Sequence, residues 1–409
     1  MHVHRRAGRW MRERRTGAAA LATVVVAAAV AALPHVSAAD SGASDHGRYG
    51  RGTLQADVRA VRAAAGDARV LAEVNTGHGA LRARSGSGKQ AVPWKAQFRV
   101  ASTTKTFTAT AALQLVADGK LSLTDTVEKW LPGVVSSHGN DGSKITVRDL
   151  LQQTSGLFDY VDDPDLARSL TEDFDKHRYD ATPPQEWVKV AMRHRPLFTP
   201  DPKSPRWAYS NTNYLLAAMV IEKAGGLSWR EQVEHRIIAP LGLRHTYVAG
   251  ANPFLPGPHA RVYLRTPEGT RLDVTEQSLQ HTADSAVVST TADLNTFFRA
   301  LATGRLLPPA QLAQMQHTVA RTGDTEDLAE WPRGGYGLGL RWVPLSCGGG
   351  YWHHEGDGFG SYTRTGVTPD GSRSVAVSIT STGSRPDPTA LNTAARKLVD
   401  HALCADDRR

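Results

Sequence analysis

The chain is poor in cysteine and has no apolar run long enough to span a bilayer. Only two of its 409 residues are cysteine and they form no C-x-x-C pair, which argues against a redox motif. The most apolar stretch covers about 16 residues, short of the roughly 20 that a membrane helix needs. No basic stripe interleaved with aromatics occurs, so a nucleic-acid partner is not implied. Hydrophobic and charged contents of 40% and 22% instead indicate a globular protein.

The first 39 residues have the composition of a signal peptide. Six arginines precede the apolar run at residues 18–33, and Val36-Ser37-Ala38-Ala39 follows it. Small residues at this position suit signal-peptidase cleavage after Ala38 or Ala39. A retained membrane anchor is the alternative, disfavoured by the short run. We therefore expect a secreted or extracellular cell-envelope protein with no stable membrane span after cleavage, in which residues 40–51 form a solvated linker.

Export also changes the charge and the state of the cysteines. The leader carries six Arg and one Glu, so its removal lowers the net charge from +8 to about +3. Oxidising conditions outside the cell favour one disulfide between Cys347 and Cys404. Two buried free thiols are the alternative.

Hydrophobic periodicity predicts the regular elements. Apolar spacing favours helices at residues 54–65, 106–117, 213–224 and 389–403, with Gly stops after several of them. Alternation and turn signals favour strands at 69–74, 80–84, 96–100, 336–342, 350–354, 361–367 and 374–380. Strands therefore come from both chain ends and short helices fill the middle.

This order predicts an α/β (α+β) fold in which an antiparallel sheet, flanked by helices, is completed by both chain ends. The sheet domain would comprise residues 52–119 and 334–409. Residues 120–333 would form an inserted, mostly helical domain, with the active site between the two.

Ser102 and Lys105 form the first candidate catalytic motif. If Ser102 begins a helix, a residue three positions later lies on the same face, so the Lys105 amine can reach the serine hydroxyl as its base. Backbone N–H groups at the helix start can hold a developing oxyanion. An N-cap serine beside a surface lysine is the alternative for this motif alone.

Two further motifs follow in the chain. Tyr209 and Asn211 precede a predicted helix; we expect the lysine ammonium to lower the pKa of the Tyr209 phenol, so that it can shuttle protons. The Asn211 amide would hold a substrate carbonyl, although helix capping alone would also explain it. His354 and Gly356 lie in a predicted strand, where alternation places them on one face and Gly356 lets a substrate backbone lie close.

Together, S-x-x-K, Y-x-N and H-x-G in this order resemble the penicillin-recognising serine hydrolases, which include D-alanyl-D-alanine carboxypeptidases and class C-type β-lactamases. The flanking sequence FRVA before Ser102, LLQQTSGL at residues 150–157 and YGLGL at residues 336–340 are similar to stretches of that family. The resemblance covers nearly the whole chain after the leader. It implies the β-lactamase/transpeptidase-like fold and no cofactor.

The resemblance also assigns further residues. It implies that Arg341 holds the terminal carboxylate of a substrate, that the Asp357 backbone N–H completes the oxyanion hole, and that Cys347 and Cys404 match the cysteines of secreted carboxypeptidases. His354 would belong to the catalytic group. The implied partners are a small peptide or a peptidoglycan stem peptide, with a β-lactam as acylating ligand, and the chain would be a monomer.

We therefore expect a serine-type D-Ala-D-Ala carboxypeptidase. Glu355 and Asp357 depart from the family pattern and should repel an anionic terminus unless Arg341 compensates. A D-aminopeptidase, amidase or esterase of the same family is therefore the next hypothesis, followed by a β-lactamase and a non-catalytic penicillin-binding envelope protein. His353 and His354 also suggest a metal site, but neighbouring strand residues point to opposite faces, so no metal is expected.

Overall fold

The computed structural model describes residues 49–76, 79–88, 91–171, 174–266, 268–320, 334–384 and 387–405. The predicted signal peptide and most of the predicted linker lie outside these residues. Within them no helix is long and apolar enough to cross a membrane.

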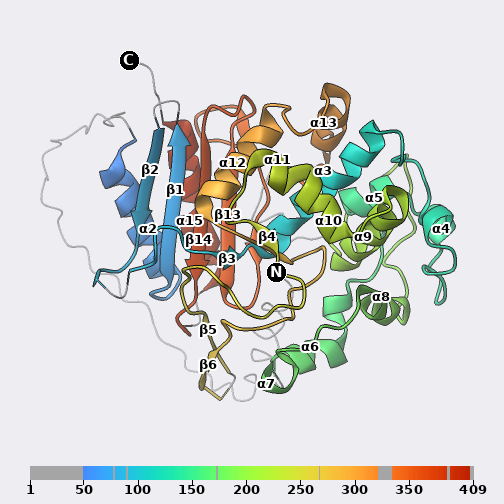
Figure 1. Ribbon diagram of the computed structural model, residues 1–409, viewed down its shortest axis with the longest axis horizontal. Coiled ribbons are helices and arrows are strands. Elements are labelled where there is room, and N and C mark those ends of the chain that lie inside the picture. The colour runs from blue at the N-terminus through green and yellow to red at the C-terminus, as the bar shows by residue number, and fades with distance from the viewer. Residues whose placement is uncertain are drawn as a thin grey trace, which may run out of the picture.

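A nine-stranded sheet lies to the left of the main group of helices in Figure 1. Its strand order is β2-β1-β14-β13-β11-β10-β9-β8, with β12 pairing to β13, and every pair is antiparallel. The strands are β1 (Arg69–Thr76), β2 (Gly79–Arg84), β8 (Val319–Ala320), β9 (Gly335–Tyr336), β10 (Arg341–Pro344), β11 (Gly350–His353), β12 (Gly356–Asp357), β13 (Ser361–Val367) and β14 (Ser374–Thr380). The fold class expected from the sequence is confirmed, because strands from both chain ends meet at β1 and β14.

Helices cover both faces of this sheet. The first and last helices of the described residues, α2 (Arg51–Ala64) and α15 (Pro388–Cys404), pack against each other and share one apolar cluster with β1 and β14. On the other side α12 (Thr291–Ala302) packs against β1, β13 and β14. Every residue of β14 is buried, as expected for a strand covered on both faces.

The helical part is organised around α3 (Thr104–Ala117), which is buried over almost its whole length. It packs against α9 (Asn211–Gly225), α10 (Trp229–Val233) and α13 (Pro309–Gln316). The Phe107 and Phe297 rings stack at 3.8 Å and join α3 to α12. The packing therefore crosses the predicted domain boundary: α3 lies in the helical core, and α12, from the predicted insert, lies on the sheet.

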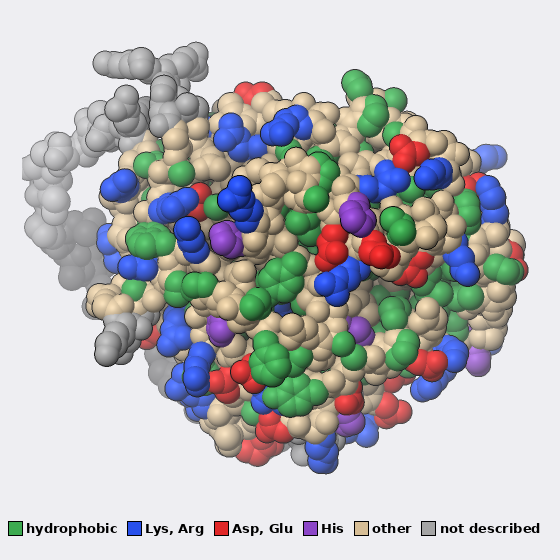
Figure 2. Space-filling model, viewed as in Figure 1, with side chains coloured by type: hydrophobic (Ala, Val, Ile, Leu, Met, Phe, Trp, Pro, Cys, Tyr) green, Lys and Arg blue, Asp and Glu red, His purple; other side chains and the backbone are tan. Residues whose placement is uncertain are grey.

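The remaining elements surround this core. They are the α-helices α4 (Val127–Trp130), α5 (Val147–Gln152), α6 (Pro164–Thr171), α7 (Phe174–His177), α8 (Pro184–Met192) and α11 (Ala239–Leu241), the short 3-10 helices η2 (Ala101–Thr103), η3 (Gly142–Lys144) and η4 (Tyr160–Asp162), the π-helix η5 (Glu234–Ile238), and the strands β3 (Phe98–Arg99), β4 (Tyr247–Val248), β5 (Tyr263–Arg265), β6 (Arg271–Asp273) and β7 (Val287–Ser289). On the face shown in Figure 2, acidic and basic side chains are interspersed with hydrophobic ones.

Three predicted strands differ from the observed ones. The strand at 96–100 is reduced to β3, which pairs with β7 in a separate three-stranded sheet. The strand at 336–342 is interrupted by Gly339, whose φ is +66° and whose hydrogen faces the Ala109 methyl and the Lys105 carbonyl of α3. The strand at 350–354 ends at His353.

Cys347 and Cys404 form the predicted disulfide.

Candidate active site

Ser102 lies at a sharp bend between the small sheet and the helical core. The chain leaves β3, turns through η2 and enters α3. Ala101, directly before the serine, has a φ of +49°, in the left-handed region that L-residues other than glycine rarely adopt. This bend places the serine at the beginning of α3, as the sequence predicts.

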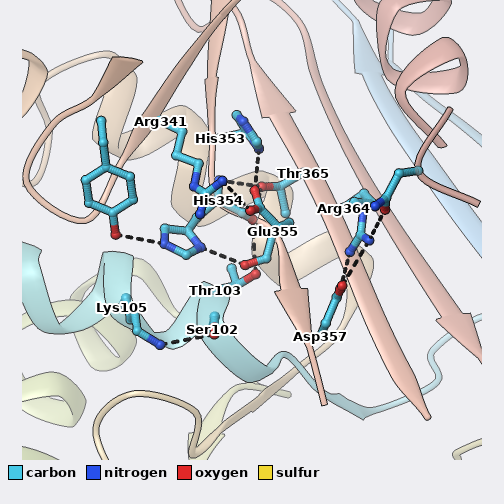
Figure 3. Close-up of polar contacts among 12 residues, drawn as sticks. Ser102, Thr103, Lys105, Arg341, His353, His354, Glu355, Asp357, Arg364 and Thr365 are labelled. Carbon is cyan, nitrogen blue, oxygen red and sulfur yellow. Dashed lines mark hydrogen bonds and ion pairs between the residues drawn. The ribbon is translucent and has the colours of Figure 1, made fainter. Parts of the chain in front are cut away.

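Lys105 is buried one turn later and makes three hydrogen bonds. Its Nζ lies 3.0 Å from Ser102 Oγ, 2.7 Å from Asn211 Oδ1 and 3.0 Å from the Asp284 carbonyl oxygen. The predicted pairing of serine and lysine is therefore present in the structure (Figure 3). Each of the three acceptors comes from a different part of the chain.

Burial lowers the pKa of the Lys105 ammonium to about 8. The carboxylates of Asp284 and Asp159 oppose this shift, whereas the Arg341 guanidinium adds to it. An amine with this pKa is deprotonated in a useful fraction of molecules near neutral pH, which is what a general base requires.

Asn211 connects Lys105 to a buried carboxylate. While its Oδ1 accepts from Lys105, its Nδ2 donates to Asp159 Oδ2 at 2.9 Å. One Nδ2 hydrogen is therefore used inside the protein, and only the second remains to hold a substrate carbonyl as predicted.

Tyr209 lies beside the pair, with the Lys105 Nζ 5.0 Å from its ring centroid. The predicted lowering of its pKa is wrong: burial raises the pKa of the phenol well above its usual value, and a hydrogen bond with Ser102 and the charge of Arg341 only partly oppose this. Tyr209 is therefore a neutral phenol that can pass a proton on through its hydroxyl group, without existing as a phenolate.

His354 is fully buried and held on both ring nitrogens. Its Nδ1 lies 2.6 Å from the Glu355 carbonyl oxygen and its Nε2 lies 3.1 Å from the Tyr336 hydroxyl. Because a carbonyl only accepts, Nδ1 carries the proton and Nε2 accepts from Tyr336. Burial lowers the pKa of His354 to about 3, so the ring is neutral. The predicted strand alternation with Gly356 fails, since His354 follows the end of β11.

Arg341 forms a buried ion pair with Glu355. Arg341 Nη1 lies 2.6 Å from Glu355 Oε1, and the two side chains are 4% and 5% exposed. His353 Nδ1 lies 3.4 Å from the other carboxylate oxygen. Burial would raise the pKa of Glu355, but Arg341 and His353 more than offset it and hold the pKa well below 4.5. The charge of the predicted carboxylate anchor is thus already balanced within the protein.

Asp357 and Gly356 lie on β12, against the turn that carries Ser102. The Asp357 carboxylate pairs with Arg364, with Nη2 to Oδ2 at 3.3 Å, and Figure 3 shows this pair directed away from Ser102 and Lys105. A Cβ on Gly356 would lie 1.9 Å from the Val100 carbonyl oxygen and 3.1 Å from the Ser102 nitrogen. Gly356 is therefore required by the chain's own packing, a different reason from the predicted approach of a substrate.

The sequence patterns did not predict a role in the site for three of its polar residues. They are Gln153 and Asp159, on either side of the TSGL stretch, and Asp284. The Gln153 carbonyl accepts from the Ala208 N–H at 3.0 Å, and its Oε1 accepts from the Ser210 N–H at 3.0 Å. Gln153 therefore holds the backbone on both sides of Tyr209. A single sequence gives no signal for such long-range contacts.

No group of three or more His, Cys, Asp or Glu side chains in the described part of the chain is arranged to hold a metal ion. His353 pairs with Glu355 and His354 with Tyr336, so the two rings have separate partners.

Comparisons with known proteins agree with this geometry. A D-stereospecific amidohydrolase from a Streptomyces species is 41% identical, with a TM-score of 0.75, over 83% of this chain and 97% of that one. The D-amino acid amidase of Ochrobactrum anthropi SV3, solved with L-phenylalanine amide, is 25% identical, with a TM-score of 0.70, over 86% and 97% of the two chains.

A curated relative matches a shorter region. Penicillin-binding protein 4* of Bacillus subtilis is 34% identical over 153 residues, which is 37% of this chain and 30% of that protein. The chain thus spans less than a third of the length of this relative. The Beta-lactamase family profile, in contrast, matches residues 54–400. From its sequence motifs, fold and family match, the chain belongs to the Beta-lactamase family, whose members are serine hydrolases.

Proposed function

We propose that the chain is a D-stereospecific amidohydrolase that releases ammonia or an amine from D-amino acid amides through an acyl-enzyme on Ser102. The observation that carries the proposal is the buried Arg341–Glu355 ion pair. A D-Ala-D-Ala carboxypeptidase has to bind a substrate carboxylate, whereas an amide substrate ends in a neutral group. Pairing with Glu355 removes the unbalanced positive charge that an anionic terminus would need.

The charges around Lys105 support the same substrate class. Three carboxylates act on Lys105, those of Asp284, Asp159 and Glu355, against the single additional cation Arg341. This excess of negative charge favours a substrate with a free α-ammonium group and disfavours an anionic one. The resemblance to the Streptomyces amidohydrolase points in the same direction.

The site residues suggest how the reaction would proceed. Neutral Lys105 accepts the Ser102 proton while Ser102 Oγ attacks the amide carbon, and the backbone N–H groups of Ser102 and Asp357 would hold the oxyanion. The amide C–N bond breaks as Tyr209 relays a proton to the leaving nitrogen. Water then attacks the ester carbonyl, and the D-amino acid leaves with Ser102 regenerated.

The test compares substrates that differ in one feature. Ammonia release from D- and L-phenylalanine amide is measured beside D-alanine release from a peptide ending in D-alanyl-D-alanine. Selective turnover of the D-amide is expected. Faster release of D-alanine would favour the carboxypeptidase, and turnover of a chromogenic cephalosporin above both would favour a β-lactamase.

A labelled penicillin tests the acyl-enzyme directly. Intact-mass and peptide analysis should place one adduct on Ser102, absent from Ser102→Ala and retained in Ser136→Ala, which changes an exposed serine. An adduct at another residue would overturn the assignment of the nucleophile.

We also propose that residues 1–39 direct export and that the mature chain acts outside the cell. N-terminal sequencing of protein recovered from the medium should give a first residue of Ala39 or Asp40.

A further inference from the structure

The direction of the Lys105 lone pair depends on its hydrogen-bond acceptors. A neutral amine has two N–H bonds and one lone pair, whereas amide and carbonyl oxygens only accept hydrogen bonds. The oxygens of Asn211 at 2.7 Å and Asp284 at 3.0 Å therefore take both N–H bonds. The lone pair then faces the third neighbour, Ser102 Oγ at 3.0 Å. This is the arrangement that a base accepting the serine proton requires.

This arrangement holds only if Asn211 presents its oxygen to Lys105. With the amide reversed, an N–H group would face the amine, and the lone pair would turn toward Asn211 instead of Ser102. Asp159 excludes that reversal because a carboxylate only accepts, and it takes the Asn211 Nδ2 hydrogen at 2.9 Å. Asp159 is 3% exposed and belongs to the turn before η4, where its Oδ1 also accepts from the Val161 N–H.

We propose that Asp159 is the positioning residue of the general base: its carboxylate fixes the amide of Asn211, and that amide directs the Lys105 lone pair at Ser102. Asp159 does not touch the reacting atoms, so it positions the base only through Asn211. The proposal rests on the acyl transfer at Ser102 proposed above.

Asp159 also acts on Lys105 through its charge. Burial lowers the pKa of Lys105, and the Asp159 carboxylate is one of the groups that raise it again. The other titratable or charged groups around Lys105 and Asp159 are Asp284, Glu355, Arg341, His354, Tyr160, Tyr209 and Tyr214. Removing the Asp159 charge alone should therefore move the titration of Lys105 to lower pH.

Two variants separate the two effects. Asp159→Asn keeps an acceptor oxygen and removes the charge, whereas Asp159→Ala removes both. Asp165→Asn is the matched control, because its side chain is 83% exposed and pairs with Arg168 at 3.5 Å. The assay is hydrolysis of p-nitrophenyl acetate between pH 5 and 10, since this ester carries no group that titrates there.

The expected results differ between the variants. Asp159→Asn should lower kcat less than Asp159→Ala, because it keeps one acceptor oxygen, and should move the ascending limb of the pH profile down by about one pH unit. Asp159→Ala should lose kcat by about 10²-fold with little change in KM, because the base is misdirected. Unchanged profiles in both variants, or a loss confined to KM, would overturn the proposal.

A second measurement does not require turnover. The ¹³Cε resonance of Lys105, assigned by its loss in Lys105→Arg, is titrated in wild type, Asp159→Asn and Asp165→Asn. The midpoint should lie near pH 8 in wild type and in the control, and lower in Asp159→Asn. Equal midpoints in all three proteins would refute the inference even if the ester is a substrate. Failure of ester hydrolysis with a shifted midpoint would instead count against the proposed function.

Discussion

Replacement of Glu355 by glutamine removes one partner of a buried ion pair. Arg341 and Glu355 are 4% and 5% exposed and lie 2.6 Å apart, so water cannot compensate the guanidinium that remains. Removing one member of such a pair typically costs about 3–5 kcal/mol of stability. We expect a loss of this size for Glu355→Gln at pH 7, measured by urea unfolding followed through tryptophan fluorescence.

The pH dependence of this loss has a definite sign. The folded protein holds the pKa of Glu355 well below its usual 4.5, so the carboxylate stabilises the fold above pH 4.5. That stabilisation disappears as the pH falls through the lower folded-state pKa. The difference between wild type and Glu355→Gln should therefore be full at pH 7 and shrink progressively below pH 4.5.

A double-mutant cycle provides the control. Arg341→Met combined with Glu355→Gln removes both charges, so it should be less destabilising than the sum of the single changes, with a coupling of about 1–3 kcal/mol. Glu128→Gln, at a carboxylate outside the site, controls for a general change of net charge. If the two losses simply add, the pair does not interact as described, and the argument for an amide substrate loses its basis.

Three other predictions test separate parts of the structure. The kcat/KM of wild type for a neutral ester should rise with pH to a plateau, with a midpoint near the Lys105 pKa of about 8, because only the neutral amine accepts the serine proton. A kcat/KM that stays constant from pH 6 to 10 would contradict the role of Lys105 as the base. Gln153→Ala should lower kcat by about tenfold, since the Ser210 N–H directly after Tyr209 loses its side-chain acceptor, whereas Gln153→Glu keeps that acceptor and should lose less; equal losses would argue for packing alone. Cys347→Ser removes the disulfide to Cys404, 57 residues later in the chain, and should lower the free energy of unfolding by about 3–4 kcal/mol without changing kcat. Unfolding of wild type and variant, each with and without reductant, measures this difference.

Local patterns predicted most of the fold. The apolar spacing of residues 54–65 and 389–403 gave the positions of α2 and α15, and the alternation at 69–84 gave the β1–β2 hairpin. Such elements are recognisable because their own sequence decides which face is buried. The pairing of Ser102 with Lys105 was predictable for the same reason, since it needs only one helical turn.

The rest of the site depends on contacts distant in sequence. The sequence shows that Glu355 and Arg341 carry charge but not that they pair, so Glu355 was expected to repel an anionic substrate terminus unless Arg341 compensated. The Tyr209 pKa was predicted in the wrong direction, because the effect of burial is larger than that of a neighbouring charge. Asp159 lies 52 residues from Asn211 in the chain, and its role depends entirely on how the two segments fold together.

The left-handed conformation of Ala101 has a consequence for how the enzyme loses activity. An alanine in this region costs about 1 kcal/mol, which the packing of α3 and β12 around it has to offset. When denaturant weakens that packing, the bend is expected to relax before the sheet melts. Inactivation should therefore precede global unfolding as urea rises, and Ala101→Gly, which removes the strain, should raise the stability of the fold while leaving the nucleophile less firmly oriented.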